Sequence, residues 1–341
     1  MKTDNRLSEL NNWLATLATK WSIDLSSIHP ASSDASFRRY FRVLGRQNGQ
    51  NTSFIVMDAP PPQEDTRPFV HIAGLLGQSG VNVPTVLEAD LEKGFLLLSD
   101  LGHQTYLSAL SPTSAPKLYQ DASSALIKIQ LASQPGQVPN YDQALLQREL
   151  DLFPEWYLGR HLQMTLSEVE KQDLAKVFSL ILENNLAQAP VFVHRDYHSR
   201  NLMVTESNNP GILDFQDAVY GPITYDLASL FRDAYIEWEE PEQMDWLIRY
   251  WDMARKAGLP VQQEFGDFYR DFEWMGLQRH LKVLGIFARL YHRDGKDGYL
   301  KDMPLVFKYA RKVAERYIQL KPLVRLLDRI EGIDHPDGLT F

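Results

Sequence analysis

The stretch VHRDYHSRNLMV, residues 193 to 204, places two histidines, two arginines, an aspartate and an asparagine between short apolar runs. Polar side chains at this density, bounded by strand-forming residues, are rarely a feature of a protein core. The apolar run at its end, 202–204, is separated from a further apolar run, 212–215, by TESNNPG, a run of turn-forming residues. We expect these runs to pair as an antiparallel hairpin, which brings Asn201 at its entry beside Asp214 near its exit.

Asp196 lies a few residues before this hairpin, so three oxygen-bearing side chains are expected near its open end. Mg²⁺ prefers carboxylate and amide oxygens and usually binds together with phosphate. Asp and Asn beside turns also cap helices or close Asx-turns, which is the structural alternative. The full set favours a metal and a nucleotide, because its order and spacing match the catalytic loop and metal-binding segment of kinases: His194-Arg195-Asp196, Asn201 and Asp214-Phe215.

The chain around this stretch has two parts of different character. Up to about residue 101 the pattern predicts a mainly antiparallel sheet with one helix, and from about residue 112 it predicts long helices interrupted by a short β segment at 191–216. This is an α+β organisation, with a β-rich N-lobe at 1–101 and a helical C-lobe at 102–341. The expected strands are 37–44, 52–59 and two within 83–102, and the expected helices are 67–80, 115–134, 142–163, 166–187, 242–257 and 265–292.

Composition restricts the function classes. The 341 residues include no cysteine, which excludes disulfides, thiolate catalysis and cysteine-based metal sites. A formal net charge of -9 argues against a general nucleic-acid-binding protein but allows a small anionic ligand. The first residues show a helical stripe rather than a signal peptide, and no apolar run is long enough to span a membrane. We therefore expect a cytoplasmic protein without an obligate protein partner.

The sequence resembles the aminoglycoside phosphotransferase and choline kinase-like family, which has the bilobal protein-kinase fold. The resemblance covers roughly residues 25–310, through FVHRDYHSRNLMV, the segment GILDFQDAVYGPITYDLASL and the hinge-like GFLLLSDLG. Within this family it is most similar to the anomeric sugar kinases that phosphorylate N-acetylmuramic acid and N-acetylglucosamine in peptidoglycan recycling. SDASFRRYFRV, LFPEWYLGRHL and QRHLKVLGIFARLYHRDGK are among the stretches that indicate this group.

The resemblance implies a role for each motif residue. Asp196 would be the catalytic carboxylate that accepts the proton of the sugar hydroxyl. Asn201 and Asp214 would hold Mg²⁺ against the phosphates of ATP. Asp226 would be a buried support for the catalytic loop, whereas Asp217 is a weaker candidate for the metal or the substrate.

The nucleotide side departs from the protein-kinase pattern. The strand SFIVMDA offers no lysine for the phosphates, and SSDASFRRY stands where a glycine-rich loop is expected. Backbone amides of residues 33–37 would cradle the phosphates, and Arg38, Arg39 or Arg42 would supply the missing charge, with Arg38 and Arg42 on one face of a strand. The predicted nucleotide contacts are Ser33, Ser36, Phe37, Arg38, Arg42, Ser99, Asp100 and Leu101.

Acceptor recognition rests on fewer signals. On the helix expected at 265–292, Arg279, Lys282 and Arg289 recur at helical spacing, either as a solvated face or as contacts for the lactyl carboxylate of a muramic acid. Aromatic side chains in LFPEWYLGRHL would stack on a sugar or pack in the core. The candidate acceptor residues are Trp156, Arg232 and Arg279.

The leading hypothesis is an ATP- and Mg²⁺-dependent kinase acting on the anomeric hydroxyl of N-acetylmuramate or N-acetylglucosamine. Another small acceptor in the same family, namely an aminoglycoside, choline or homoserine, is the enzyme alternative. The missing lysine leaves open a nucleotide-binding pseudokinase without turnover, although the intact acidic set argues against it. A protein kinase is disfavoured, because the segment after Asp214 leaves little room for an activation loop.

Overall fold

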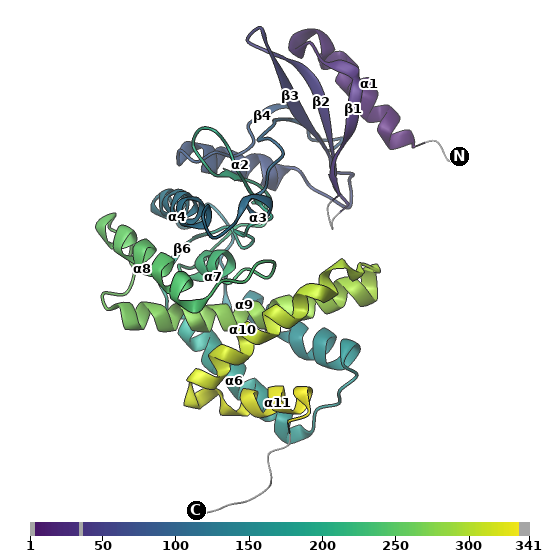
Figure 1. Ribbon diagram of the computed structural model, residues 1–341. Helices are drawn as coiled ribbons and strands as arrows, with labels where there is room; N and C mark the ends of the chain where they lie inside the picture. The colour runs from purple at the N-terminus through teal and green to yellow at the C-terminus, as the bar shows by residue number, and fades with distance from the viewer. Residues whose placement is uncertain (1–3, 34–36, 334–341) are drawn as a thin grey trace, which may run out of the picture. The chain divides into compact units, whose positions relative to one another are not determined.

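The computed structural model describes residues 4–33 and 37–333, which form two compact units (Figure 1). The first unit comprises Met1–Ala109 and Asn201–Asp217, and the second comprises Leu110–Arg200 and Ala218–Phe341. The first unit thus includes a segment from the middle of the chain that the sequence pattern places with the helical part.

A five-stranded antiparallel sheet in the order β1-β2-β3-β5-β4 dominates the first unit. Helix α1 packs on it through Leu10 and Leu14, which join Val43, Val56 and Phe95 in one apolar cluster. The elements are α1 (Asn5–Trp21), β1 (Asp24–Ser33), β2 (Arg39–Gln47), β3 (Gln50–Asp58), α2 (Arg67–Gln78), β4 (Val86–Asp90), β5 (Phe95–Ser99) and α3 (Tyr106–Ala109).

The sequence pattern did not predict β1. Its residues, DLSSIHPASS, are mostly polar and include Pro30. Among the described residues they form an edge strand that pairs with β2, and proline is tolerated at the edge of a sheet because one side of the strand needs no ladder donor.

The hairpin predicted to follow residues 193–201 is confirmed. Strands β7 (Leu202–Met203) and β8 (Gly211–Ile212) pair antiparallel, with Leu202 opposite Ile212. Backbone hydrogen bonds from Val204 to the Gln104 carbonyl and from Ile212 to the Asn82 carbonyl, both at 2.8 Å, join the hairpin to the first unit.

The second unit is mainly helical and is organised around the long helix α9. The predicted helices are present, except that the one expected at 142–163 divides at Phe153 into an α-helix and a π-helix, where Pro154 lacks the N–H of a regular helix. The α-helices α10 and α11 after residue 302, and the short 3₁₀-helix η3 between them, were not predicted. The elements are α4 (Ala115–Leu131), α5 (Gln143–Leu152), η1 (Phe153–His161), α6 (Glu168–Leu186), β6 (Pro190–Val193), β9 (Val219–Pro222), α7 (Tyr225–Phe231), α8 (Glu240–Lys256), α9 (Phe265–Asp294), η2 (Asp297–Asp302), α10 (Met303–Arg316), η3 (Ile318–Leu320) and α11 (Lys321–Glu331).

Helix α9 is buried over most of its length. Its apolar side chains lie in the core, with Leu277, Leu281 and Leu284 fully enclosed. At Gly285 a Cβ atom would lie 2.4 Å from the carbonyl oxygen of Leu152, so only glycine allows the approach of α5 at this point. No helix among the described residues has the length and hydropathy needed to cross a membrane.

Candidate active site

In the first unit, the hairpin brings Asn201 and Asp214 together as predicted. The side-chain amide nitrogen of Asn201 lies 3.4 Å from Oδ2 of Asp214, and the Asn201 carbonyl accepts the backbone N–H of Leu213 at 2.9 Å. Asp214 has a φ of 61°, a left-handed conformation that Asp tolerates better than most residues. This backbone conformation directs a carboxylate to the same place as the amide of Asn201.

Arg38 is directed at this pair. Its Nη2 lies 3.5 Å from Oδ1 of Asp214, and its Nε lies 3.9 Å from a carboxylate oxygen of Glu64. The Arg38 side chain is only 11% exposed, so its charge is weakly screened by water. A guanidinium is therefore held beside the Asn201–Asp214 pair.

The other two arginines of this segment have different partners. Arg39 pairs with the fully buried Asp58 at 2.6 Å and also with Asp4. Arg42 pairs with Asp100 and donates from Nη2 to the Gly102 carbonyl at 2.8 Å. Both arginines tie the sheet together, which leaves Arg38 as the arginine that reaches Asp214.

The predicted hinge residues are held tightly. Asp100 accepts hydrogen bonds from Arg42, from the Ser53 hydroxyl at 2.7 Å and from the Gly102 backbone at 3.0 Å. Burial alone raises the pKa of Asp100, but these donors lower it below its ordinary value. Ser99 ends β5 and its hydroxyl accepts the Thr85 N–H at 2.8 Å, while Leu101 packs against Gly211.

The remaining predicted nucleotide contacts come from the segment before β2. Ser33 ends β1, and Phe37 is 69% exposed with its backbone N–H 3.3 Å from a Glu64 carboxylate oxygen. Ser36 lies outside the described residues.

In the second unit, β6 leads into the segment His194-Arg195-Asp196. Arg195 has a φ of 77°, a strained conformation for a residue with a long side chain. The buried carboxylate of Asp226, in α7, accepts the backbone N–H of His194 at 2.7 Å and that of Arg195 at 3.0 Å. Asp226 thus supports the segment His194-Arg195-Asp196, as the sequence predicted, and the buried imidazole of His194 accepts the Asp196 N–H at 3.2 Å.

A buried charge network lies behind this segment and was not predicted. Glu149 pairs with the guanidinium of Arg195 and, at 2.9 Å, with the ammonium of Lys282; the hydroxyl of Tyr141 donates to the same carboxylate. Lys282 also donates to the Tyr225 hydroxyl at 2.9 Å. Burial raises the pKa of Glu149, but Lys282 and Arg195 lower it below its ordinary value, so the carboxylate is ionised. The network anchors the Arg195 side chain from α5 and α9.

The same positive charges act on Asp196. Burial opposes ionisation of this half-buried carboxyl, but Lys282 in particular, together with Arg279, holds its pKa below the ordinary value. Asp196 is therefore an ionised carboxylate near neutral pH, which a proton acceptor requires.

His198 and Arg200 follow Asp196 and differ in their surroundings. His198 is buried against the Tyr235 ring, with centroids 5.3 Å apart, and its Nδ1 has no hydrogen-bond partner among the described residues. Burial lowers the pKa of His198, which favours a neutral imidazole. The guanidinium of Arg200 lies 3.5 Å from the Tyr235 ring centroid and 3.7 Å from a carboxylate oxygen of Asp302.

The three candidate acceptor residues have different environments. Arg232 is 4% exposed and pairs with the buried Glu273 at 2.9 Å, so its charge is already neutralised within the core. Trp156 is half-buried in η1. Arg279 is 3% exposed and its Nη1 has no hydrogen-bond partner among the described residues. The solvated face considered for Arg279 and Lys282 is therefore wrong, because both side chains are buried.

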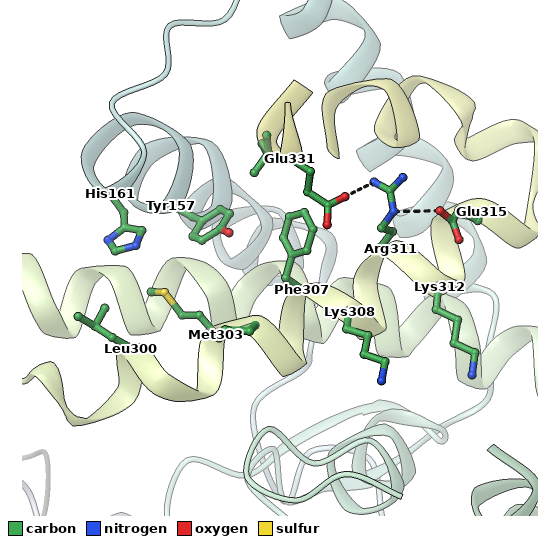
Figure 2. Close-up of a pocket in the computed structure, with 12 residues that line it drawn as sticks. Tyr157, His161, Leu300, Met303, Phe307, Lys308, Arg311, Lys312, Glu315 and Glu331 are labelled. Carbon is green, nitrogen blue, oxygen red and sulfur yellow. Dashed lines mark ion pairs between the residues drawn. The ribbon is translucent and has the colours of Figure 1, made fainter. Parts of the chain in front are cut away.

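A pocket of about 620 Å³ lies elsewhere in the second unit, between η1, α10 and α11 (Figure 2). Its wall combines Tyr157, Met303 and Phe307 with charged side chains, and none of the candidate site residues lines it. Arg311 in this wall is paired with Glu315 at 2.9 Å and Glu331 at 2.7 Å. The pocket is thus formed by other residues than the candidate active site.

These features are compatible with phosphoryl transfer, and comparisons with known proteins show that the chain is a phosphotransferase. Residues 27–265 match the model of the phosphotransferase enzyme family. The chain is 50% identical over 337 residues to an N-acetylmuramate/N-acetylglucosamine kinase of Pseudomonas aeruginosa, covering 96% of this chain and 97% of that protein. It is 48% identical to the kinase of the same name from Pseudomonas putida, covering 96% and 98% of the two chains.

The chain belongs to this phosphotransferase enzyme family. The fold agrees with that of a choline kinase from Streptococcus pneumoniae, with a TM-score of 0.60 and 14% identity over 87% of this chain and 97% of that one. It also agrees with an ADP-bound aminoglycoside phosphotransferase, with a TM-score of 0.53 and 15% identity over 88% and 97% of the two chains. The predicted α+β kinase-like fold is thereby confirmed.

Proposed function

We propose that this phosphotransferase is an N-acetylmuramate/N-acetylglucosamine kinase that uses ATP and Mg²⁺ to phosphorylate the anomeric hydroxyl of the sugar. The observation that carries the proposal is the near-full-length similarity to kinases of that name, at 50% identity over 96% of the chain. The ionised Asp196 and the Asn201–Asp214 pair supply the chemistry that such a reaction needs. Peptidoglycan recycling in the cytoplasm is the corresponding biological setting.

Asp196 is the proposed catalytic residue. The attacking hydroxyl must lose its proton as the phosphoryl group arrives, and an ionised carboxylate accepts or orients that proton. The hydrogen bonds that the Asp226 side chain accepts from the backbone, together with the ion pair between Glu149 and Arg195, hold the segment that carries Asp196. A carboxylate held in position lowers the reaction barrier, because the reacting groups need not be oriented anew at each turnover.

Asn201 and Asp214 are the proposed magnesium ligands. An amide oxygen and a carboxylate suit Mg²⁺, which usually takes one or two protein ligands and completes its shell with phosphate oxygens and water. When bound, Mg²⁺ would neutralise charge on the nucleotide phosphates.

Arg38 is the proposed substitute for the missing strand lysine. Of the three arginines at 38, 39 and 42, it is the one within ion-pair distance of Asp214, and its second contact, Glu64, keeps the side chain in place. A guanidinium binds phosphate oxygens through two parallel N–H groups, whereas a lysine acts as a point charge. Ser33, Ser36, Phe37, Ser99, Asp100 and Leu101 remain proposed nucleotide contacts.

The acceptor side is proposed to lie in the second unit. Arg279 is the strongest of the three candidates, since its guanidinium is enclosed but not paired with a carboxylate of the described chain. Arg232 is occupied by Glu273, and Trp156 remains a proposed stacking surface for a sugar ring.

The test is an assay of ADP release with purified protein, ATP and Mg²⁺ against N-acetylmuramate, N-acetylglucosamine, choline and kanamycin. Asp196→Asn serves as the matched control, because it preserves shape and removes the proton acceptor. Turnover of the two sugars, lowered about 10²- to 10⁴-fold in the variant, supports the proposal. Turnover with only choline or kanamycin overturns the substrate assignment, and nucleotide binding without any turnover identifies a pseudokinase.

A further inference from the structure

Arg279 is a buried cation without an ion-pair partner among the described residues. Its side chain is 3% exposed, its Nη1 is enclosed without a hydrogen-bond partner, and no carboxylate in residues 4–33 and 37–333 pairs with it. Three other cations of this unit have carboxylate partners: Arg232 pairs with Glu273, and Lys282 and the half-buried Arg195 pair with Glu149. A guanidinium withdrawn from water without a partner is strongly unfavourable unless an anion binds to it.

The position of Arg279 relates it to the reacting group. Arg279 and Lys282 are three residues apart on α9 and so share one face of the helix. Lys282 on this face reaches Glu149, which in turn holds Arg195, the neighbour of Asp196. The positive charge of Arg279 also contributes to the lowered pKa values of Asp196 and His198.

A second buried polar group in this region lacks a partner. Nδ1 of His198 is enclosed without a hydrogen bond among the described residues, although its ring is held against Tyr235. Nη1 of Arg279 and Nδ1 of His198 are thus two enclosed polar atoms from different elements without a hydrogen-bond partner among the described residues. A ligand that carries negative charge and hydrogen-bonding oxygens would satisfy both.

We infer that Arg279, with His198 beside it, receives the carboxylate of N-acetylmuramate and determines the preference between the two sugars. The inference rests on the proposed function. N-acetylmuramate differs from N-acetylglucosamine by a lactyl ether that ends in a carboxylate, and a guanidinium binds this group with two parallel hydrogen bonds. The phosphoryl group is the other anion available during turnover, and the experiment separates the two sources.

The experiment compares kcat/KM for the two sugars in wild type, Arg279→Met and Arg279→Lys at pH 8, where Asp196 stays ionised. Arg279→Met is expected to lower kcat/KM for N-acetylmuramate about 100-fold and for N-acetylglucosamine less than about threefold. Arg279→Lys keeps the positive charge but loses the planar guanidinium. Its kcat/KM for N-acetylmuramate is expected to lie between those of wild type and Arg279→Met. Arg270→Met removes an exposed arginine from the same helix and is the control for general effects on α9.

The methyl ester of N-acetylmuramate provides a matched ligand. For wild type, kcat/KM is expected to be lower with the ester than with the free acid, by about the factor by which Arg279→Met lowers kcat/KM for the free acid. Arg279→Met is expected to have the same kcat/KM for the acid and the ester. An equal loss for both sugars, together with a raised KM for ATP, would assign Arg279 to the phosphoryl group and overturn the inference. An equal loss with a lowered Tm would make its role structural, and a wild type that phosphorylates neither sugar overturns the proposed function and the inference with it.

Binding provides a readout without turnover. Calorimetry with N-acetylmuramate and no nucleotide should show weaker binding to Arg279→Met than to wild type or Arg270→Met. Unchanged binding in Arg279→Met would contradict the inference even if activity falls.

Discussion

The carboxylate of Asp226 accepts the backbone N–H of Arg195 at 3.0 Å, at a residue whose φ of 77° places it in the left-handed region. Left-handed backbone at a long side chain persists only where surrounding bonds hold it. Asp226 supplies two of these bonds, since its other oxygen accepts the N–H of His194. It is therefore a positioning residue for the peptide that carries Asp196.

Asp226→Ala is expected to lower kcat about 100-fold with little change in either KM, because it releases the backbone before Asp196 without touching a substrate. Asp226→Asn retains one acceptor oxygen and should recover part of the loss. Steady-state kinetics with the better sugar measures both variants. A wild-type kcat in both Asp226 variants would show that the strained backbone at Arg195 does not depend on Asp226.

Asn201→Ala and Asp214→Asn are expected to raise the Mg²⁺ concentration for half-maximal activity by about tenfold or more, because each removes one of two proposed ligands. Magnesium titrations at saturating ATP test this. Glu206→Gln, in the exposed turn of the same hairpin, is the control for effects on hairpin structure. An unchanged magnesium requirement in Asp214→Asn would remove it from the metal site.

Arg38→Met is expected to raise the KM for ATP by about 10- to 100-fold, the effect of losing hydrogen bonds from a charged donor. Arg38→Lys should restore part of the affinity because it keeps the positive charge. Arg46→Met, which removes an exposed arginine of β2, should behave as wild type. A loss in Arg38→Met that the lysine variant does not recover, with a lowered Tm in both, would indicate a structural ion pair with Glu64 and Asp214.

Glu149→Gln leaves Arg195 and Lys282 buried without their shared carboxylate and is expected to lower the free energy of unfolding by about 3 kcal/mol. The pKa of Glu149 is lower in the folded chain than its ordinary value of 4.5. Its stabilisation is therefore present above about pH 4.5 and lost as the pH falls through the folded pKa. Denaturant titrations at pH 7 and pH 4 should show the difference between wild type and variant shrinking at the lower pH.

The exposed Glu183→Gln is the control for that series and should unfold like wild type at both values of pH. A constant difference between wild type and Glu149→Gln across this range would mean that Glu149 is not held ionised by Lys282 and Arg195.

Local spacing made the central residues predictable. Asp196, Asn201 and Asp214 lie within a short segment whose hairpin follows from two apolar runs and a turn. The polar edge strand β1 could not be found in this way, because hydrophobic alternation is weak where one side of a strand needs no partner. The π-helix that follows α5 was also hidden, since its side chains keep a helical apolar pattern.

Long-range pairing explains what else remained hidden. Strand alternation groups Arg38 with Arg42, yet Asp100 binds one and Asp214 lies beside the other, and nothing local to the arginines distinguishes them. Glu149 carries no signal in its own helix, because its partners come from the catalytic segment and from α9. Basic residues on a helix usually indicate a solvated face. Arg279 is buried instead, which only the folded structure shows.

Helix α9 has a consequence for how this chain can evolve. Gln278 bonds to the Leu146 carbonyl, His280 to the Arg232 carbonyl and Lys282 to Glu149, while Arg279 points to none of these partners. One inserted or deleted residue upstream would turn all of these side chains by about 100° around the axis at once. A substitution therefore changes one contact of helix α9, whereas an insertion or deletion changes all of them. Related chains should differ in length in their loops and not in this helix.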